Sequence, residues 1–288
     1  MLGRVLGRLV SGYRVVRNGI DFPLRSALRI RRPIDAVMPC GLAAALGELS
    51  DEQAHRAREL IDRYGLHAFT LRGRQHDILE NLYYLEMLTS AFDKSGVSLP
   101  ADHIAAIDVG VSDWFYAPAF AAALRYWQPT AMELSFPQPR VSWDGRRVAA
   151  LGFEADPSRL YADGHSRADW ADWFTRDTPG LTYIPEDARS WRGNVDVATM
   201  LFPFVFTADS DRWGLPRSLF HPVDLLWHVH DRLRPGGILV VANQGEKEAI
   251  AQRVLLTSLG APPVWSDRFE SPFWTYDLPR FVHVIVKH

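Results

Sequence analysis

Acidic side chains close or follow three short apolar runs of the chain, and their chemistry suits a nucleotide-like ligand: Asp108, Glu154 and Asp187. Apolar runs of this length predict strands. The carboxyl ends of parallel strands meet at one edge of a sheet, where carboxylates accept hydrogen bonds from ribose hydroxyls and amino groups. The pattern therefore predicts a ligand site at that edge.

The loop 108–114 reads Asp-Val-Gly-Val-Ser-Asp-Trp and joins the first apolar run to a helix-like segment. A sharp turn after a strand favours glycine, because Gly110 can adopt a positive φ and lets a ligand approach the backbone. Amides at the start of the following helix can meet polar or anionic parts of a ligand. We expect Asp108, Gly110 and Ser112 to line the site. An ordinary strand-to-helix turn is the alternative.

The segment 152–157 reads Gly-Phe-Glu-Ala-Asp-Pro and supplies the second group of candidates. An acid at the end of the strand beside the first one can accept hydrogen bonds from both ribose hydroxyls. Glu154 is the stronger candidate and Asp156 the second; the alternative is a solvated or helix-capping acid. Farther along, Asp187 stands where a carboxylate could accept a bond from an adenine amino group.

From residue 101 onward, strand patterns alternate with helix patterns. Strands are predicted over 104–109, 147–154, 180–185, 195–206, 238–242 and 280–287, and helices over 118–127, 166–174, 221–233 and 246–259. Strands this apolar are typical of a parallel sheet covered by helices on both faces, so we expect an α/β fold. The segment 131–136, with Glu133 as its acid, is an alternative second strand.

Residues 1–100 show helical patterns without alternating strands, which predicts a helical extension or cap. The sequence Ser50-Asp-Glu-Gln53 is typical of a helix start, and we expect helices over 50–64 and 76–93. The turn-rich segment 95–100 is the predicted boundary. The chain is thus divided into the extension, residues 1–100, and an α/β domain, residues 101–288.

The first 32 residues are strongly basic, with eight arginines against a single acid, Asp21. Apolar residues interleave with the arginines, which predicts a basic amphipathic helix. Such a helix can contact a membrane surface or a partner. It can also pack on its own domain with its arginines facing water, and we favour this second interpretation.

The composition is that of an ordinary globular protein, with 47% hydrophobic and 23% charged residues among 288. The formal net charge of −2 gives no overall attraction to nucleic acid. Cys40 is the single cysteine, which excludes an internal disulfide and a multi-thiolate zinc site and fits a reducing compartment. No apolar run approaches the ~20 residues of a spanning helix, and no signal-peptide pattern is present. We therefore expect a cytoplasmic protein.

Taken in order, these motifs resemble the class I S-adenosylmethionine-dependent methyltransferases. The most specific part is 233–241, Leu-Arg-Pro-Gly-Gly-Ile-Leu-Val-Val, because that family places such a turn between its fourth helix and fifth strand. The resemblance covers about residues 101–288. It implies a three-layer, Rossmann-like fold whose seven-stranded sheet is mostly parallel with an antiparallel last strand.

The resemblance also implies S-adenosylmethionine as the cofactor, bound over the first two strands. The residues implied to bind it are Asp108, Gly110 and Ser112 near the methionine part, Glu154 and Asp156 at the ribose, and Asp187 at the adenine. No metal is predicted. No catalytic residue is assigned, because methyl transfer from a sulfonium depends mainly on alignment of the reacting atoms.

The glycine-rich loop departs from the family pattern Gly-x-Gly-x-Gly, since Ser112 and Trp114 stand at the second and third glycine positions. A protein that kept the fold and lost the chemistry would show the same change. Two hypotheses follow: a methyltransferase acting on a small molecule, and a non-catalytic binding or scaffolding protein with the same fold. The lone Gly110 and the lack of a Tyr-x-x-x-Lys pair disfavour a nicotinamide-dependent oxidoreductase.

Aromatic residues in the segment 202–207 could sandwich a planar or apolar acceptor, although a buried strand rich in phenylalanine would look the same. Asn243 and Gln244, after the fifth strand, are further candidates for this pocket. Nucleic acid is a disfavoured acceptor, because residues 101–288 show no basic stripe with interleaved aromatic residues. The pattern leaves the methylated atom and the oligomeric state open.

Overall fold

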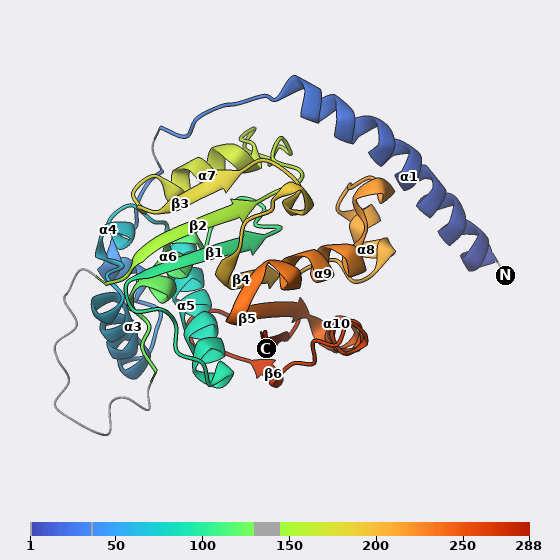
Figure 1. Cartoon of the computed structure of the whole chain (residues 1–288). Helices are drawn as coiled ribbons and strands as arrows, with labels where there is room; N and C mark the ends of the chain where they lie inside the picture. Colours follow the sequence, from blue (N-terminus) through green and yellow to red (C-terminus); the bar gives the residue numbers. More distant parts are fainter. Residues whose placement is uncertain (1, 36, 130–144) are drawn as a thin grey trace.

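The computed structural model describes residues 2–35, 37–129 and 145–288, and Figure 1 shows their arrangement. The alternative second strand over 131–136 lies outside the described residues. In the described part, the strands are β1 His103–Val109, β2 Arg147–Phe153, β3 Leu181–Ile184, β4 Val195–Leu201, β5 Leu233–Gln244, β6 Trp265–Phe269 and β7 Arg280–Val286.

These strands form one seven-stranded sheet in the order β3-β2-β1-β4-β5-β7-β6. Strand β7 is antiparallel to both of its neighbours, and the other pairings are parallel. The predicted α/β fold, with a mostly parallel sheet and an antiparallel last strand, is confirmed.

Helices cover both faces of the sheet, so the fold has three layers (Figure 1). The α-helices are α1 Leu2–Leu28, α2 Leu42–Ala45, α3 Asp51–Arg63, α4 His67–Thr70, α5 Gln75–Ser95, α6 Ala117–Tyr126, α7 Arg167–Thr175, α8 Thr207–Arg212, α9 Pro222–Arg232 and α10 Gly245–Ser258. Short 3₁₀ turns, η2 Ala188–Ser190 and η3 Arg217–Leu219, follow β3 and α8. None of the described helices has the length and hydropathy needed to cross a membrane.

Alternate residues of the strands enter two separate hydrophobic cores. In β5, Ile238 and Val240 pack with α5 and α6, whereas Leu239 and Val241 pack with α9 and α10. This alternation follows from the pleat of a strand, which sends successive side chains to opposite faces. Both faces of β5 are therefore buried, as its continuous apolar run predicts.

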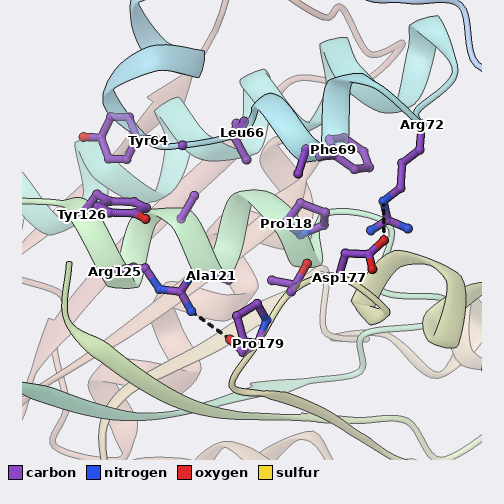
Figure 2. A pocket seen from close by; sticks show the side chains of 14 residues that line it. Tyr64, Leu66, Phe69, Arg72, Pro118, Ala121, Arg125, Tyr126, Asp177 and Pro179 are labelled. Atoms are coloured by element: carbon purple, nitrogen blue, oxygen red, sulfur yellow. Dashed lines mark hydrogen bonds and ion pairs between the residues drawn. The ribbon is translucent and has the colours of Figure 1, made fainter. Parts of the chain in front are cut away.

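Helices α2 to α5 contribute to the larger of the two cores. The predicted helix start at Ser50 is confirmed: its hydroxyl accepts a bond from the Gln53 amide, and the Gln53 side chain accepts one from the Ser50 amide. A shallow hollow remains between α4 and α6, beside Pro179 (Figure 2). It lies at the amino ends of the strands, away from the predicted site.

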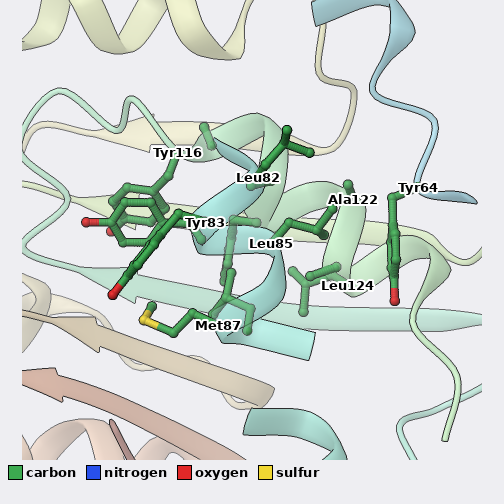
Figure 3. Packing of buried hydrophobic residues seen from close by; sticks show 14 of the residues in the cluster. Tyr64, Leu82, Tyr83, Leu85, Met87, Tyr116, Ala122 and Leu124 are labelled. Atoms are coloured by element: carbon green, nitrogen blue, oxygen red, sulfur yellow. The ribbon is translucent and has the colours of Figure 1, made fainter. Parts of the chain in front are cut away.

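Helix α5 packs against α6 and against the sheet. Figure 3 shows Leu82, Leu85 and Met87 of α5 in one core with Ala122 and Leu124 of α6. The predicted boundary near residue 100 falls in the connection between α5 and β1. Because α5 shares its core with the sheet, its N-terminal end is held firmly beside the carboxyl ends of the strands.

Three local predictions from the sequence differ from the structure. The predicted strand 195–206 is wrong at its end, because β4 stops at Leu201 and Phe202 adopts a φ of 64° that turns the chain. Strand β5 starts at Leu233 and not at residue 238 as predicted. The pairing with β4 shifts register at the Pro-Gly-Gly segment, so this segment is included in the strand. Strand β6 was not predicted, because its mixed polar sequence pairs only with β7.

Candidate functional site

The carboxyl ends of β1, β2 and β3 lie side by side. Val109 pairs with Phe153, and Phe153 pairs with Ile184, so the three strands end at the same level. The predicted site residues stand at or just beyond these ends. The strand ends that the sequence predicted to be neighbours are therefore neighbours.

The loop after β1 folds over the end of β2 and leaves open space beside Gly110. The Gly110 amide donates a 2.8 Å hydrogen bond to the Phe153 carbonyl, and Gly110 has a φ of 78°. A Cβ added at Gly110 would meet no heavy atom within 4 Å. A ligand can therefore approach the backbone here, as the glycine predicted.

The two residues that replace family glycines keep the left-handed backbone of glycine. Ser112 has a φ of 56° and Trp114 a φ of 49°. Each conformation costs on the order of 1–2 kcal/mol for a residue with a Cβ. The loop has thus retained the shape of a glycine-rich turn at an energetic cost, and strained backbone of this kind gathers at functional sites.

The indole of Trp114 lies below this loop, in the core. Its ring packs against Gly152 of β2, where an added Cβ would lie 2.7 Å from ring atoms. The centroids of the Trp114 and Phe120 rings are 6.1 Å apart. Its Nε1 donates a 2.9 Å hydrogen bond to Asp108 Oδ2. The indole therefore fills the layer between β2 and α6 and leaves the space beside Gly110 open.

Asp108 is a fully buried carboxylate at the end of β1. Burial raises its pKa to about 6, although Thr199, Tyr116 and Trp114 act against this shift. Among the described residues, none donates to its Oδ1 in hydrogen-bonding geometry. An ammonium group placed beside this oxygen would supply the missing partner and lower the pKa.

Glu154 collects three donors just beyond β2. The Ser112 amide donates to Oε2 at 2.8 Å, while the Asp156 amide and Arg167 Nη1 donate to Oε1 at 2.8 and 2.7 Å. Glu154 and Arg167 are both buried. Each carboxylate oxygen can accept two bonds, so Oε2 retains one acceptor position that suits a ribose hydroxyl.

The other two predicted acids have strong partners within the chain. Both oxygens of the buried Asp156 accept 2.7 Å bonds from Arg25 of α1. Asp187 caps η2 and accepts two further bonds from the Arg189 guanidinium through its Oδ2, at 2.6 and 3.0 Å. Burial opposes the change, but these bonds from Arg189 lower the pKa of Asp187.

Two tyrosines that the sequence did not single out hold the loop in place. The Tyr161 hydroxyl lies 3.1 Å from Ser112 Oγ, and the Tyr183 hydroxyl donates a 3.0 Å bond to the Ser112 carbonyl. Burial raises the pKa of the neighbouring Asp113, although Tyr161 and Arg167 act in the opposite direction. The strained Ser112 is thus fixed from two sides.

An aromatic cluster lies at the ends of β4, β5 and β7. The left-handed Phe202 follows β4, and the Arg280 guanidinium lies 4.6 Å from its ring centroid and 3.9 Å from that of Tyr276. The Tyr276 hydroxyl lies 3.0 Å from Glu80 Oε1 and 3.2 Å from the Tyr84 hydroxyl. Burial raises the pKa of Glu80, although the bond from Tyr276 acts against it.

Arg280 is a buried cation that forms no ion pair with a described acid. Burial raises the pKa of Glu248, and the charge of Arg280 acts against this shift. Its Nη1 donates to Gln244 Oε1 at 3.4 Å and to the Leu278 carbonyl at 3.2 Å, and its Nε has no described partner. Arg280 was not predicted from the sequence, although an arginine at the start of an antiparallel last strand must lie at the carboxyl edge of the other strands.

The two polar residues predicted at the end of β5 behave differently. Gln244 is half-buried, and its Oε1 accepts the bond from Arg280. Asn243 is fully buried, and neither its amide nitrogen nor its amide oxygen has a partner among the described residues. No group of three or more histidine, cysteine or acidic side chains that could hold a metal occurs in the described part of the chain.

No family model and no curated protein sequence matches the chain. Among solved structures, it is similar to a SAM-dependent methyltransferase from Aquifex aeolicus, at 12% identity over 80% of this chain and 96% of that one, with a TM-score of 0.44. It is also similar to magnesium protoporphyrin IX methyltransferase from Synechocystis PCC 6803, at 11% identity over 84% and 99% of the two chains, with a TM-score of 0.44.

A putative RNA methyltransferase from Pyrococcus horikoshii is similar at 11% identity over 92% of this chain and 94% of that one, with a TM-score of 0.43. Likenesses this distant identify neither a cofactor nor a substrate. The strand order and the single antiparallel strand decide the fold. The chain has the class I methyltransferase fold. Within this methyltransferase fold, the loop at Gly110 and the acid Glu154 occupy the strand ends where the sequence predicted them.

Proposed function

We propose that this chain is an S-adenosylmethionine-dependent methyltransferase that acts on a small molecule. Three observations at neighbouring strand ends carry the proposal: the open space beside Gly110, the buried Asp108 Oδ1 that lacks a described partner, and the Glu154 carboxylate that binds the loop amide of Ser112. S-adenosylmethionine requires an acceptor for its ammonium group, an acceptor for its ribose hydroxyls and room along the loop backbone.

In this proposal the chain binds and aligns the cofactor. Asp108 pairs with the ammonium group of the methionine part, Glu154 accepts a bond from a ribose hydroxyl, and Asp187 receives the adenine amino group. When bound, S-adenosylmethionine supplies an activated methyl group on a sulfonium. The work left to the protein is to orient the acceptor and exclude water, which needs no acid–base triad.

We assign the acceptor to the aromatic cluster of Phe202, Tyr84, Tyr276 and Arg280. The aromatic rings suit a planar or apolar body. The buried Arg280 suits an anionic group, because a buried charge is costly until it meets an opposite one. Glu80, with its raised pKa and its contact to Tyr276, is placed to take a proton from an acceptor at this end of the sheet.

Calorimetry with S-adenosylmethionine tests the cofactor assignment. Wild-type protein is expected to bind saturably, and Glu154→Gln is expected to bind at least about tenfold more weakly, because a ribose bond to a charged acceptor is lost. Glu186→Ala, an exposed acid in the loop after β3, is the matched control and keeps wild-type affinity. Equal affinities of Glu154→Gln and wild type would refute the ribose assignment.

The buried Glu154–Arg167 pair favours a second candidate, a non-catalytic protein with the methyltransferase fold. Arg167 already neutralises the carboxylate that the cofactor would use. On this alternative, Arg167 takes the place of the ligand, and the wild type shows no thermal shift with S-adenosylmethionine or S-adenosylhomocysteine. The calorimetric titration separates the two candidates.

A further inference from the structure

Helix α1 is held to the rest of the protein by one polar face. The buried Asn18 donates to the carbonyls of Asp211 and Leu215 at 2.8 and 3.3 Å. Two turns later, Arg25 donates 2.7 Å hydrogen bonds to both Asp156 oxygens and a 2.8 Å bond to the Gly214 carbonyl. These contacts fix which side of α1 faces inward, while the helix itself extends along the outside of the molecule (Figure 1).

The outward side of α1 carries an apolar stripe. Five large side chains recur every three or four residues and are between 56% and 67% exposed: Tyr13, Val16, Ile20, Leu24 and Leu28. The helix does pack on its own chain, as the sequence analysis favoured, but it does so through polar side chains. A continuous apolar stripe on an exposed helix is typical of a surface that binds something.

Basic side chains border the stripe. Arg14 of α1 and Arg29, which directly follows the helix, are exposed, and neither forms a side-chain ion pair with a described residue. The first 32 residues hold eight arginines and one acid, whereas the whole chain has a net charge of −2, so the remainder is acidic. Three of these arginines, Arg17, Arg25 and Arg31, are paired with acids. The apolar stripe therefore lies in a segment of net positive charge on an otherwise acidic protein.

We propose that α1 docks on an anionic membrane surface, with the stripe inserted at the level of the lipid headgroups and the arginines facing lipid phosphates. An apolar face bordered by arginines is the pattern that binds such surfaces. A second copy of the chain fits less well, because a symmetric pair of stripes would bring like charges together. The proposal goes beyond the methyltransferase assignment and does not depend on it.

Vesicle flotation of the full chain tests the proposal. The protein is expected to float with vesicles of phosphatidylcholine mixed with phosphatidylglycerol, to remain unbound with phosphatidylcholine alone, and to be released by high salt. The double variant Ile20→Gln/Leu24→Gln is expected to partition at least about tenfold more weakly. The matched control is Ile250→Gln/Val254→Gln, which alters an equally spaced and comparably exposed pair on α10.

Both double variants should unfold at the wild-type temperature, because all four side chains face solvent. The proposal is overturned if the protein binds neutral and anionic vesicles equally, if it binds neither, or if the α1 variant floats as well as the α10 control. Sedimentation without vesicles gives the remaining outcome. A dimer that only the α1 variant breaks would assign the stripe to a second copy and overturn the membrane proposal.

Discussion

The two halves of the carboxyl edge differ in how their charged groups are satisfied. Beyond β2 and β3, each of the three predicted site acids has a cation from the chain itself: Arg167 on Glu154, Arg25 on Asp156 and Arg189 on Asp187. At the end of β5 and the start of β7, Arg280 forms no ion pair and the Asn243 amide has no hydrogen-bond partner among the described residues. The first half is therefore organised before a ligand arrives, and the second half depends on a ligand to complete it.

The largest expected effect concerns the organised half. Arg167→Met leaves Glu154 buried without its cation, and we expect it to lower the free energy of unfolding by about 3–5 kcal/mol. Arg189→Met is the matched control, because the Arg189 and Asp187 side chains are 27% and 30% exposed and water screens their pair. The expected loss in this variant is about 1 kcal/mol or less. Urea denaturation measures both. Equal losses in the two variants would show that the buried pair does not organise this half.

The pH dependence of stability tests Asp108, at the junction of the two halves. Its pKa rises from 3.8 to about 6 on folding, so the folded protein holds the proton more tightly than the unfolded chain. Protonated Asp108 therefore adds to the free energy of unfolding below about pH 4. This contribution, up to about 3 kcal/mol, is lost as the pH rises through about 6. Urea titrations across this range should show the slope in wild type and its absence in Asp108→Asn. Identical slopes would contradict the raised pKa.

Arg280→Met tests the incomplete half. The probe is 4-hydroxybenzoate, a planar ring with an anionic group. We expect the variant to bind this probe about tenfold or more weakly, because a charged hydrogen bond of about 1.5–3 kcal/mol is lost. The affinity for S-adenosylmethionine should remain unchanged. Calorimetry with 4-hydroxybenzamide, an uncharged probe of the same shape, and with Arg268→Met, an exposed arginine on β6, provides the controls. Equal binding of acid and amide to wild type would remove the role of Arg280.

The smallest effect concerns the strained loop that joins the halves. Ser112→Gly and Ser112→Ala both lose the contact between Ser112 and the Tyr161 hydroxyl, but only glycine relieves the left-handed backbone. We expect Ser112→Gly to be more stable than Ser112→Ala by about 1 kcal/mol. Thermal unfolding compares the two variants. An alanine variant of equal or greater stability would show that the loop is not strained at this position.

The sequence predicted the organised half better than the incomplete one, for a physical reason. Asp108, Gly110 and Glu154 follow their strands directly, so a parallel sheet must bring them to one edge. Arg280, Glu80 and Tyr276 come from β7, α5 and the segment before β7, and their meeting depends on packing between segments that lie far apart in the sequence. Local patterns carry no information about such contacts.

The errors in predicted elements have similar causes. The apolar run after β4 continues to Phe206, but the positive φ of Phe202 ends the strand, and hydrophobicity alone does not reveal that turn. The pairing of Glu154 with Arg167 was equally hidden. Arg167 lies in a helix-start pattern, and only the return of α7 toward the end of β2 places its guanidinium on the acid.

The central claim is that the space beside Gly110 receives the cofactor between Asp108 and Glu154. A crystal structure of the wild-type protein grown with saturating S-adenosylhomocysteine tests it most directly. The account predicts the ligand's ammonium group beside Asp108 Oδ1 and a ribose hydroxyl within hydrogen-bonding distance of Glu154 Oε2. A ligand bound elsewhere would contradict the account. So would a structure with no ligand beside Gly110 in which Glu154 bonds only to Arg167 and the loop amides.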